Sequence, residues 1–110
     1  MVLRGCGSAT PSRSISNEEL GQRVETSDEW IRSRTGIGAR HVVGEKESLG
    51  ELCGQASERA LAMSGWDAES LDLILLATST PDDLFGSAPR LQARIGAGNA
   101  VAFALTAACS

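Results

Sequence analysis

The sequence predicts an α/β fold, in which helices cover a sheet that is buried on both faces. Two segments, residues 71–77 and 100–106, are almost entirely apolar, as interior strands of a parallel sheet are. A helical segment precedes each of them, so that the order after residue 48 is helix, strand, helix, strand. Hydrophobic residues make up 42% and charged residues 22% of the 110 residues, which is typical of globular rather than disordered chains.

Short elements are expected in the first part of the chain. Residues 2–7 are a candidate strand, although Arg4 and two glycines interrupt its apolar pattern. Two capping boxes then begin at Ser16 and Thr26, each with a glutamate three residues later. They predict a helix that extends to about residue 24 and a second helix over residues 27–34, which Gly36 ends.

A longer amphipathic helix is predicted before the first buried strand, and a shorter helix is predicted after it. The third capping box begins at Ser48, and apolar residues recur after it at steps of three and four until Gly65. This pattern predicts a helix of about 16 residues. Cys53 lies on its apolar face, which favours a structural role for this thiol. A further helix, over residues 87–95 with Ser87 as its cap, is expected between the two strands.

Charge and composition argue against several classes of function. The net charge of -4 argues against nucleic acid as a partner, because phosphate binding favours a basic surface. The longest uninterrupted apolar run, residues 73–77, is far shorter than the roughly 20 residues that span a membrane, so no membrane partner is expected. Three cysteines without a visible secretory signal predict reduced thiols and a cytoplasmic protein. No two of them have metal-ligand spacing, so no metal site is expected.

Cys109 is the candidate nucleophile. It follows the second buried strand and is flanked by small residues, which is where α/β enzymes place a reactive side chain. His41 is the only histidine. It could pair with Cys109 as a general base, but a single histidine is more often incidental, and we favour that interpretation.

A second candidate site lies on the predicted helix at residues 27–34. Thr26, Trp30 and Arg34 follow one another at intervals of four residues and therefore lie along one face. An indole offers a flat stacking surface and a guanidinium binds phosphate, so these residues suit a ligand with an aromatic base and phosphates. The alternative, which spacing alone favours, is that Trp30 anchors the helix to the core and the arginines are solvated.

Several motifs together resemble β-ketoacyl-acyl-carrier-protein synthase III. They are Thr26-Ser27-Asp28-Glu29-Trp30-Ile31, Arg34-Thr35-Gly36-Ile37, Arg40-His41, Ala77-Thr78-Ser79-Thr80-Pro81-Asp82, Gln92 with Ile95-Gly96-Ala97, and Ala107-Ala108-Cys109-Ser110. The resemblance covers essentially the whole chain. It implies a thiolase-like fold made of two similar halves. Residues 1–110 would then be a partial N-terminal domain, a partial mixed sheet with covering helices, that stops just after the nucleophile.

The resemblance also implies an activity and roles for individual residues. The family is an acyltransferase of fatty acid biosynthesis that condenses acetyl-CoA with malonyl-acyl carrier protein to acetoacetyl-acyl carrier protein, as a homodimer and without a cofactor. Cys109 matches the nucleophile that acetyl-CoA acylates. Trp30 matches the residue that stacks on the CoA adenine, Arg34 a contact to its phosphates, and Thr26 a neighbour on the same face. Phe85 falls in the loop that borders the acyl pocket of the partner subunit.

Two departures and two alternatives accompany the resemblance. Ala104 stands where relatives commonly have an acidic residue, and Arg4 where they are apolar. The family's catalytic histidine and asparagine belong to the second half, so these 110 residues alone are expected to be inactive, and His41 matches a position that is not catalytic. The alternatives are another thiolase-fold condensing enzyme, such as a polyketide-priming type, and a fragment without function; the motif around Trp30 favours the fatty-acid type.

Overall fold

The computed structural model describes residues 1–83 and 86–106. The chain divides into two compact units. The small unit is Thr10–Glu47, and the large unit consists of Met1–Ala9 and Ser48–Ser110. Each unit has its own secondary structure, and the two are described separately.

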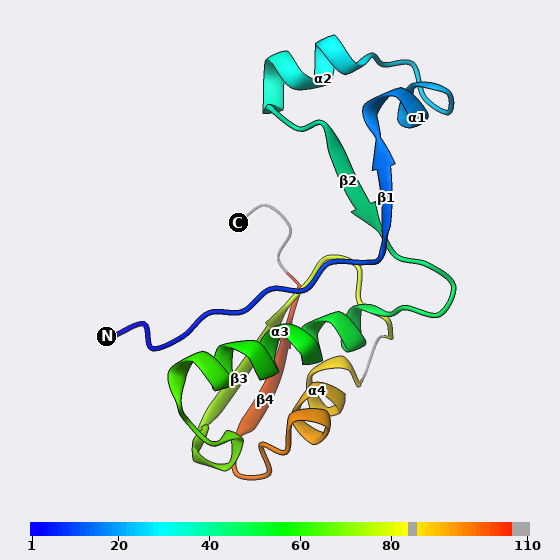
Figure 1. Ribbon diagram of the computed structural model, residues 1–110. Helices are drawn as coiled ribbons and strands as arrows, with labels where there is room; N and C mark the ends of the chain where they lie inside the picture. Colours follow the sequence, from blue (N-terminus) through cyan, green and yellow to red (C-terminus); the bar gives the residue numbers. More distant parts are fainter. Residues whose placement is uncertain (84–85, 107–110) are drawn as a thin grey trace. The chain divides into compact units, whose positions relative to one another are not determined.

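The small unit contains a two-stranded antiparallel sheet and two helices (Figure 1). Strand β1 (Arg13–Ser16) pairs with strand β2 (Ala39–Val42). Helices α1 (Asn17–Gly21) and α2 (Asp28–Thr35) lie between the two strands in the sequence. The segment that carries α2 is therefore inserted between two paired strands, and these strands fix the positions at which the segment begins and ends.

Both helices of the small unit begin at serine caps. Ser16 is the cap that the first capping box predicts, whereas the second helix is capped by Ser27, one residue after the predicted Thr26. The side chains of Ser16 and Ser27 each accept a hydrogen bond from the backbone N–H three residues later. Gly36 ends α2 with a left-handed backbone (φ 73°), as its position in the sequence predicts. The first helix stops at Gly21, before the predicted end at residue 24, because glycine is a poor helix former.

The large unit is a parallel β-α-β arrangement with one preceding helix (Figure 1). Helix α3 (Leu49–Ser64) is followed by a 3-10 turn (Ala68–Ser70) and strand β3 (Leu73–Ala77). Helix α4 (Ser87–Ile95) then leads to strand β4 (Val101–Leu105), which pairs parallel to β3. The predicted order of elements after residue 48 and the parallel pairing are confirmed.

One face of the β3–β4 sheet carries the core of the large unit. Ile74 and Leu76 of β3 are buried together with Ala88 and Leu91 of α4. Cys53 of α3 packs against this cluster, and burial raises the pKa of its thiol. A partly buried thiol whose protonated form is favoured agrees with the structural role predicted for this residue.

The opposite face of the same sheet is apolar and exposed. Its large side chains are between 50% and 63% exposed: Leu73, Leu75, Val101, Phe103 and Leu105. We call these five residues the open sheet face. The expectation that both strands are buried on both faces is therefore wrong for the described residues, because α3 and α4 pack on the same side of the sheet (Figure 1).

Two local predictions also need correction. Residues 1–9 form no strand; they pack instead on α3, where a Cβ atom on Gly5 would lie 2.5 Å from the Ala60 carbonyl oxygen. The glycines in this segment thus permit close approach to a helix backbone. Ser87 does not cap α4, because Gly86 is the N-cap and the Ser87 hydroxyl donates to the Asp83 carbonyl.

Candidate functional site

Helix α2 brings the three predicted coenzyme-binding residues onto one side of the small unit. Thr26 directly precedes the helix cap and is partly buried, while Trp30 is 56% exposed. The guanidinium carbon of Arg34 lies 4.8 Å from the centre of the Trp30 ring, in the geometry of a cation–π contact. Trp30 therefore does not anchor α2 to a core; Ile31, which is 8% exposed, is the residue of α2 that is buried.

A shallow pocket of about 250 Å³ lies beside the Trp30 ring. Its lining residues are Glu25, Thr26, Ser27 and Trp30. Pockets that enclose a whole small ligand have volumes of about 300–1,000 Å³. This pocket suits one end of a long ligand, such as a single ring system.

The two arginines of α2 differ in their electrostatic surroundings. Arg32 donates from Nε to both carboxylate oxygens of Asp28, at 2.8 and 2.9 Å, so that its charge is neutralised locally. Among the residues that the structure describes, no carboxylate forms an ion pair with Arg34. Of the two guanidinium groups, that of Arg34 is the one available to bind an anion.

A buried polar cluster that no sequence pattern predicts lies behind α2. Asn17 is 1% exposed, and its side chain contacts Asp28 and Arg40. An asparagine in a capping box at the start of a short helix is ordinarily solvated. Asn17 is buried because β2, which is distant in the sequence, packs beside it. No local sequence pattern indicates this contact.

The remaining predicted site residues can be placed only in part. His41 is exposed on β2, opposite Ser14. Cys109 and Phe85 lie outside the described residues, so their roles remain predictions, as does any pairing of His41 with the thiol. Within residues 1–83 and 86–106, no cluster of three or more potential metal ligands is present, and no helix is long and apolar enough to cross a membrane.

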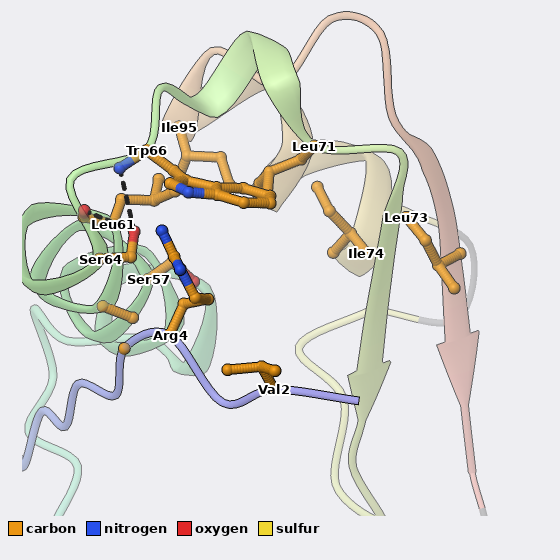
Figure 2. Close-up of a pocket in the computed structure, with 12 residues that line it drawn as sticks. Val2, Arg4, Ser57, Leu61, Ser64, Trp66, Leu71, Leu73, Ile74 and Ile95 are labelled. Carbon is orange, nitrogen blue, oxygen red and sulfur yellow. Dashed lines mark hydrogen bonds between the residues drawn. The ribbon is translucent and has the colours of Figure 1, made fainter.

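A second pocket, of about 390 Å³, lies in the large unit (Figure 2). The N-terminal segment, α3 and β3 line it, with Val2, Arg4, Trp66 and Leu73 among its residues. The Arg4 guanidinium carbon lies 5.7 Å from the centre of the Trp66 ring, and Ser64 accepts the Trp66 backbone N–H. Of the predicted site residues that the structure describes, none lines this pocket.

The fold can be compared with solved structures. The chain is similar to 3-oxoacyl-[acyl-carrier-protein] synthase III from Aquifex aeolicus, with a TM-score of 0.87 and 39% identity over 94% of this chain and 34% of that one. It is also similar to the priming β-ketosynthase of a polyketide biosynthetic pathway, with a TM-score of 0.87 and 34% identity over 96% of this chain and 32% of that one. These matches define the fold class as thiolase-like, as the sequence predicts.

The chain is also similar to curated proteins. The chain is 69% identical over all 110 residues to β-ketoacyl-[acyl-carrier-protein] synthase III of Prochlorococcus marinus MIT 9313, and 67% identical over 108 residues to that of Synechococcus sp. RCC307. It spans about a third (32%) of the length of both relatives. No protein-family model matches the chain. The chain thus resembles β-ketoacyl-acyl-carrier-protein synthase III over its whole length, which confirms the resemblance predicted from its motifs.

Proposed function

We propose that this chain is part of an acyltransferase that condenses acetyl-CoA with malonyl-acyl carrier protein, initiating fatty acid synthesis. The observation that carries the proposal is the 69% identity to a synthase III along the entire chain. The exposed Trp30 ring, with the Arg34 guanidinium on its face, supports it, because this pair suits a coenzyme that ends in a nucleotide.

In the proposed reaction, Cys109 is the nucleophile. Its thiolate attacks the carbonyl carbon of acetyl-CoA, forms an acetyl thioester and releases the thiol of CoA. Loss of CO₂ from malonyl-acyl carrier protein leaves a carbanion, which attacks this acetyl group and returns the electron pair to the Cys109 sulfur. The product is acetoacetyl-acyl carrier protein. A histidine and an asparagine outside these 110 residues would assist this step, so the 110 residues alone are expected to be inactive.

The remaining roles concern binding. Trp30 would stack on the adenine of CoA, Arg34 would bind its phosphates, and Thr26 would line the neighbouring pocket. Phe85 would border the acyl pocket of the partner subunit in a homodimer. No cofactor takes part in this chemistry. A cytoplasmic location fits the unpaired thiols of Cys6 and Cys53.

A second candidate function is priming of polyketide synthesis by the same chemistry. The fold match to a polyketide-priming β-ketosynthase favours it, because its TM-score equals that of the Aquifex aeolicus synthase III. Sequence identity to the curated synthase III relatives is higher, at 69% against 34%, which favours the fatty-acid type. The two functions differ in the acyl-CoA that acylates the nucleophile.

The test uses this chain at the length of its relatives, with the other two-thirds taken from the Prochlorococcus marinus MIT 9313 protein. We expect acetoacetyl-acyl carrier protein to form from acetyl-CoA and malonyl-acyl carrier protein, and Cys109→Ala to abolish it. A preference for longer acyl-CoA over acetyl-CoA supports the priming function instead. Absence of any acyl transfer to the protein contradicts both.

A further inference from the structure

A single buried amide lies behind the helix that carries Trp30 and Arg34. Asn17 is the one polar side chain that is fully buried among the described residues, with 1% of its surface exposed. Burial of an amide is unfavourable unless its donors and acceptor all find partners. The partners of Asn17 therefore indicate why this residue is inside.

Asn17 holds both ends of α2. Its Nδ2 donates one hydrogen bond to Asp28 Oδ1 at 2.8 Å and another to the Ile37 carbonyl oxygen at 2.7 Å. Asp28 is the first residue of α2, and Ile37 directly follows the glycine that ends it. The backbone N–H of Asn17 also donates to the Gly38 carbonyl at 3.1 Å. Hydrogen bonds from this one residue thus fix both ends of α2.

The acceptor side of the same amide is tied to the β-ribbon. Asn17 Oδ1 accepts a hydrogen bond from Arg40 on β2 at 2.6 Å, and Arg40 also donates to the Ile15 carbonyl on β1 at 3.3 Å. Asp28, in turn, accepts from Arg32. The cluster alternates donors and acceptors from β2 through Asn17 to α2, so each member orients the next.

We infer that Asn17 is a positioning residue for coenzyme binding: its amide clamps α2 to the β1–β2 ribbon, so that Trp30 and Arg34 present a preformed nucleotide-binding surface. The inference rests on the proposed function, because it concerns the same site. In this proposal, Asn17 contacts no substrate and acts by holding α2 in its orientation. Affinity for the nucleotide end of CoA should then depend on Asn17, whereas the chemical step at Cys109 should not.

The experiment measures KM and kcat for acetyl-CoA in the chain extended to the length of its relatives, and the Kd of adenosine 3′,5′-bisphosphate as a probe of the nucleotide end. We expect Asn17→Ala to raise KM and this Kd about tenfold, because a poorly held binding surface loses preorganisation. We expect kcat to change less than about twofold, because the reacting atoms lie at the other end of the coenzyme.

A matched control separates this role from general stability. Glu47 belongs to the same unit and accepts hydrogen bonds from the backbone N–H groups of Ser12 and Gly44, both at 2.9 Å. Among the described residues, neither of these partners belongs to α2. Glu47→Ala therefore removes two hydrogen bonds from the unit but leaves the clamp in place. We expect it to leave KM and the probe Kd unchanged.

An exchange of two side chains tests the clamp even if Asn17→Ala does not fold. Asn17→Asp places two carboxylates side by side and should weaken probe binding. Asn17→Asp combined with Asp28→Asn restores a donor and an acceptor between these two positions, since the amide at position 28 can donate to the new carboxylate and accept from Arg32. The hydrogen bond to the Ile37 carbonyl oxygen stays lost in this variant, because a carboxylate cannot donate. We therefore expect the double variant to recover part of the affinity that Asn17→Asp loses.

Two results separate this inference from the proposed function. If Trp30→Ala raises KM but Asn17→Ala behaves like Glu47→Ala, or the exchange gives no recovery, the clamp is not a positioning device and only this inference fails. If Trp30→Ala itself leaves KM unchanged, α2 does not bind the nucleotide, and the coenzyme contact and the inference fail together. A KM effect of Asn17 with unchanged kcat and recovery in the exchange supports the inference.

Discussion

At the scale of single residues, the proposed coenzyme contacts belong to side chains that the core does not use. Ile31 is the residue of α2 that packs inward, which leaves Trp30 and Arg34 free to form an exposed stacked pair. Single exposed apolar side chains are common on protein surfaces, but an indole stacked on a guanidinium offers a nucleotide both a flat surface and a positive charge. The pairing of Trp30 with Arg34 is therefore more informative about function than the exposure of either side chain.

Removal of the indole should weaken coenzyme binding selectively. In the extended protein, Trp30→Ala should raise KM for acetyl-CoA, because base–aromatic stacking contributes about 1–3 kcal/mol, or about 5- to 160-fold. Steady-state kinetics measures the effect, and Trp66→Ala serves as a control because this second tryptophan belongs to the other unit. A wild-type KM in the Trp30 variant would show that the ring has no ligand.

The Asp28 carboxyl reports on the buried cluster through its titration. The hydrogen bond from Asn17, followed by that from Arg32, lowers the pKa of Asp28 below its ordinary value of 3.8. The folded state therefore favours the carboxylate, and this stabilisation is present above pH 3.8 and is lost as the pH falls through the lower, folded pKa. We expect Asn17→Ala to move the pKa upward, as an NMR titration of Asp28 would show; an unchanged pKa would mean that the hydrogen bond is absent in solution.

At the scale of elements, some helix ends were predictable from the sequence, but contacts between distant segments were not. Serine caps and terminal glycines act over three or four residues, so Ser16 and Gly36 could be identified from the sequence alone. Residues 1–9 have the composition of a weak strand, but their glycines are explained by contact with α3, which is distant in the sequence. Likewise, the burial of Asn17 depends on tertiary contacts.

The contact between α3 and α4, which are distant in the sequence, leads to a prediction about stability. Gly54 is buried in the middle of α3, and a Cβ atom there would collide with the Arg94 side chain, which pairs with Glu51 and Glu58. Gly54→Ala should therefore destabilise the fold by about 1–3 kcal/mol, despite the better helix propensity of alanine.

A double-mutant cycle identifies the cause. In an Arg94→Ala background the obstruction is gone, so Gly54→Ala should instead stabilise by up to about 1 kcal/mol. Urea denaturation of the four proteins measures both values. Equal effects in the two backgrounds would show that Arg94 is not the reason for the glycine.

At the scale of the whole molecule, the open sheet face is the main difference from the predicted fold. The apolar runs correctly predicted two strands that pair in parallel, but the described helices cover only one side of the β3–β4 sheet. The sequence resembles a protein of which it spans about a third, so the pattern of the strands describes a more complete sheet than these residues build.

This face should make the 110 residues associate by themselves. Leu75 and Phe103 are 63% and 54% exposed and lie opposite each other on neighbouring strands. Contiguous apolar surface of this kind drives self-association in water. Sedimentation velocity should show concentration-dependent association, and Leu75→Lys combined with Phe103→Lys should reduce it. A wild-type chain that stays monomeric across the concentration series would contradict the expectation.

We propose that this chain supplies the nucleophile of a condensing enzyme, and acyl transfer to Cys109 tests this role most directly. The extended protein is incubated with acetyl-CoA alone, and its cysteine-containing peptides are examined by mass spectrometry. We expect one acetyl group on the Cys109 peptide and none on those of Cys6 or Cys53, whose thiol is partly buried in the core of the large unit. Acetylation of the other two to the same extent, or no acetylation of Cys109, would contradict the account.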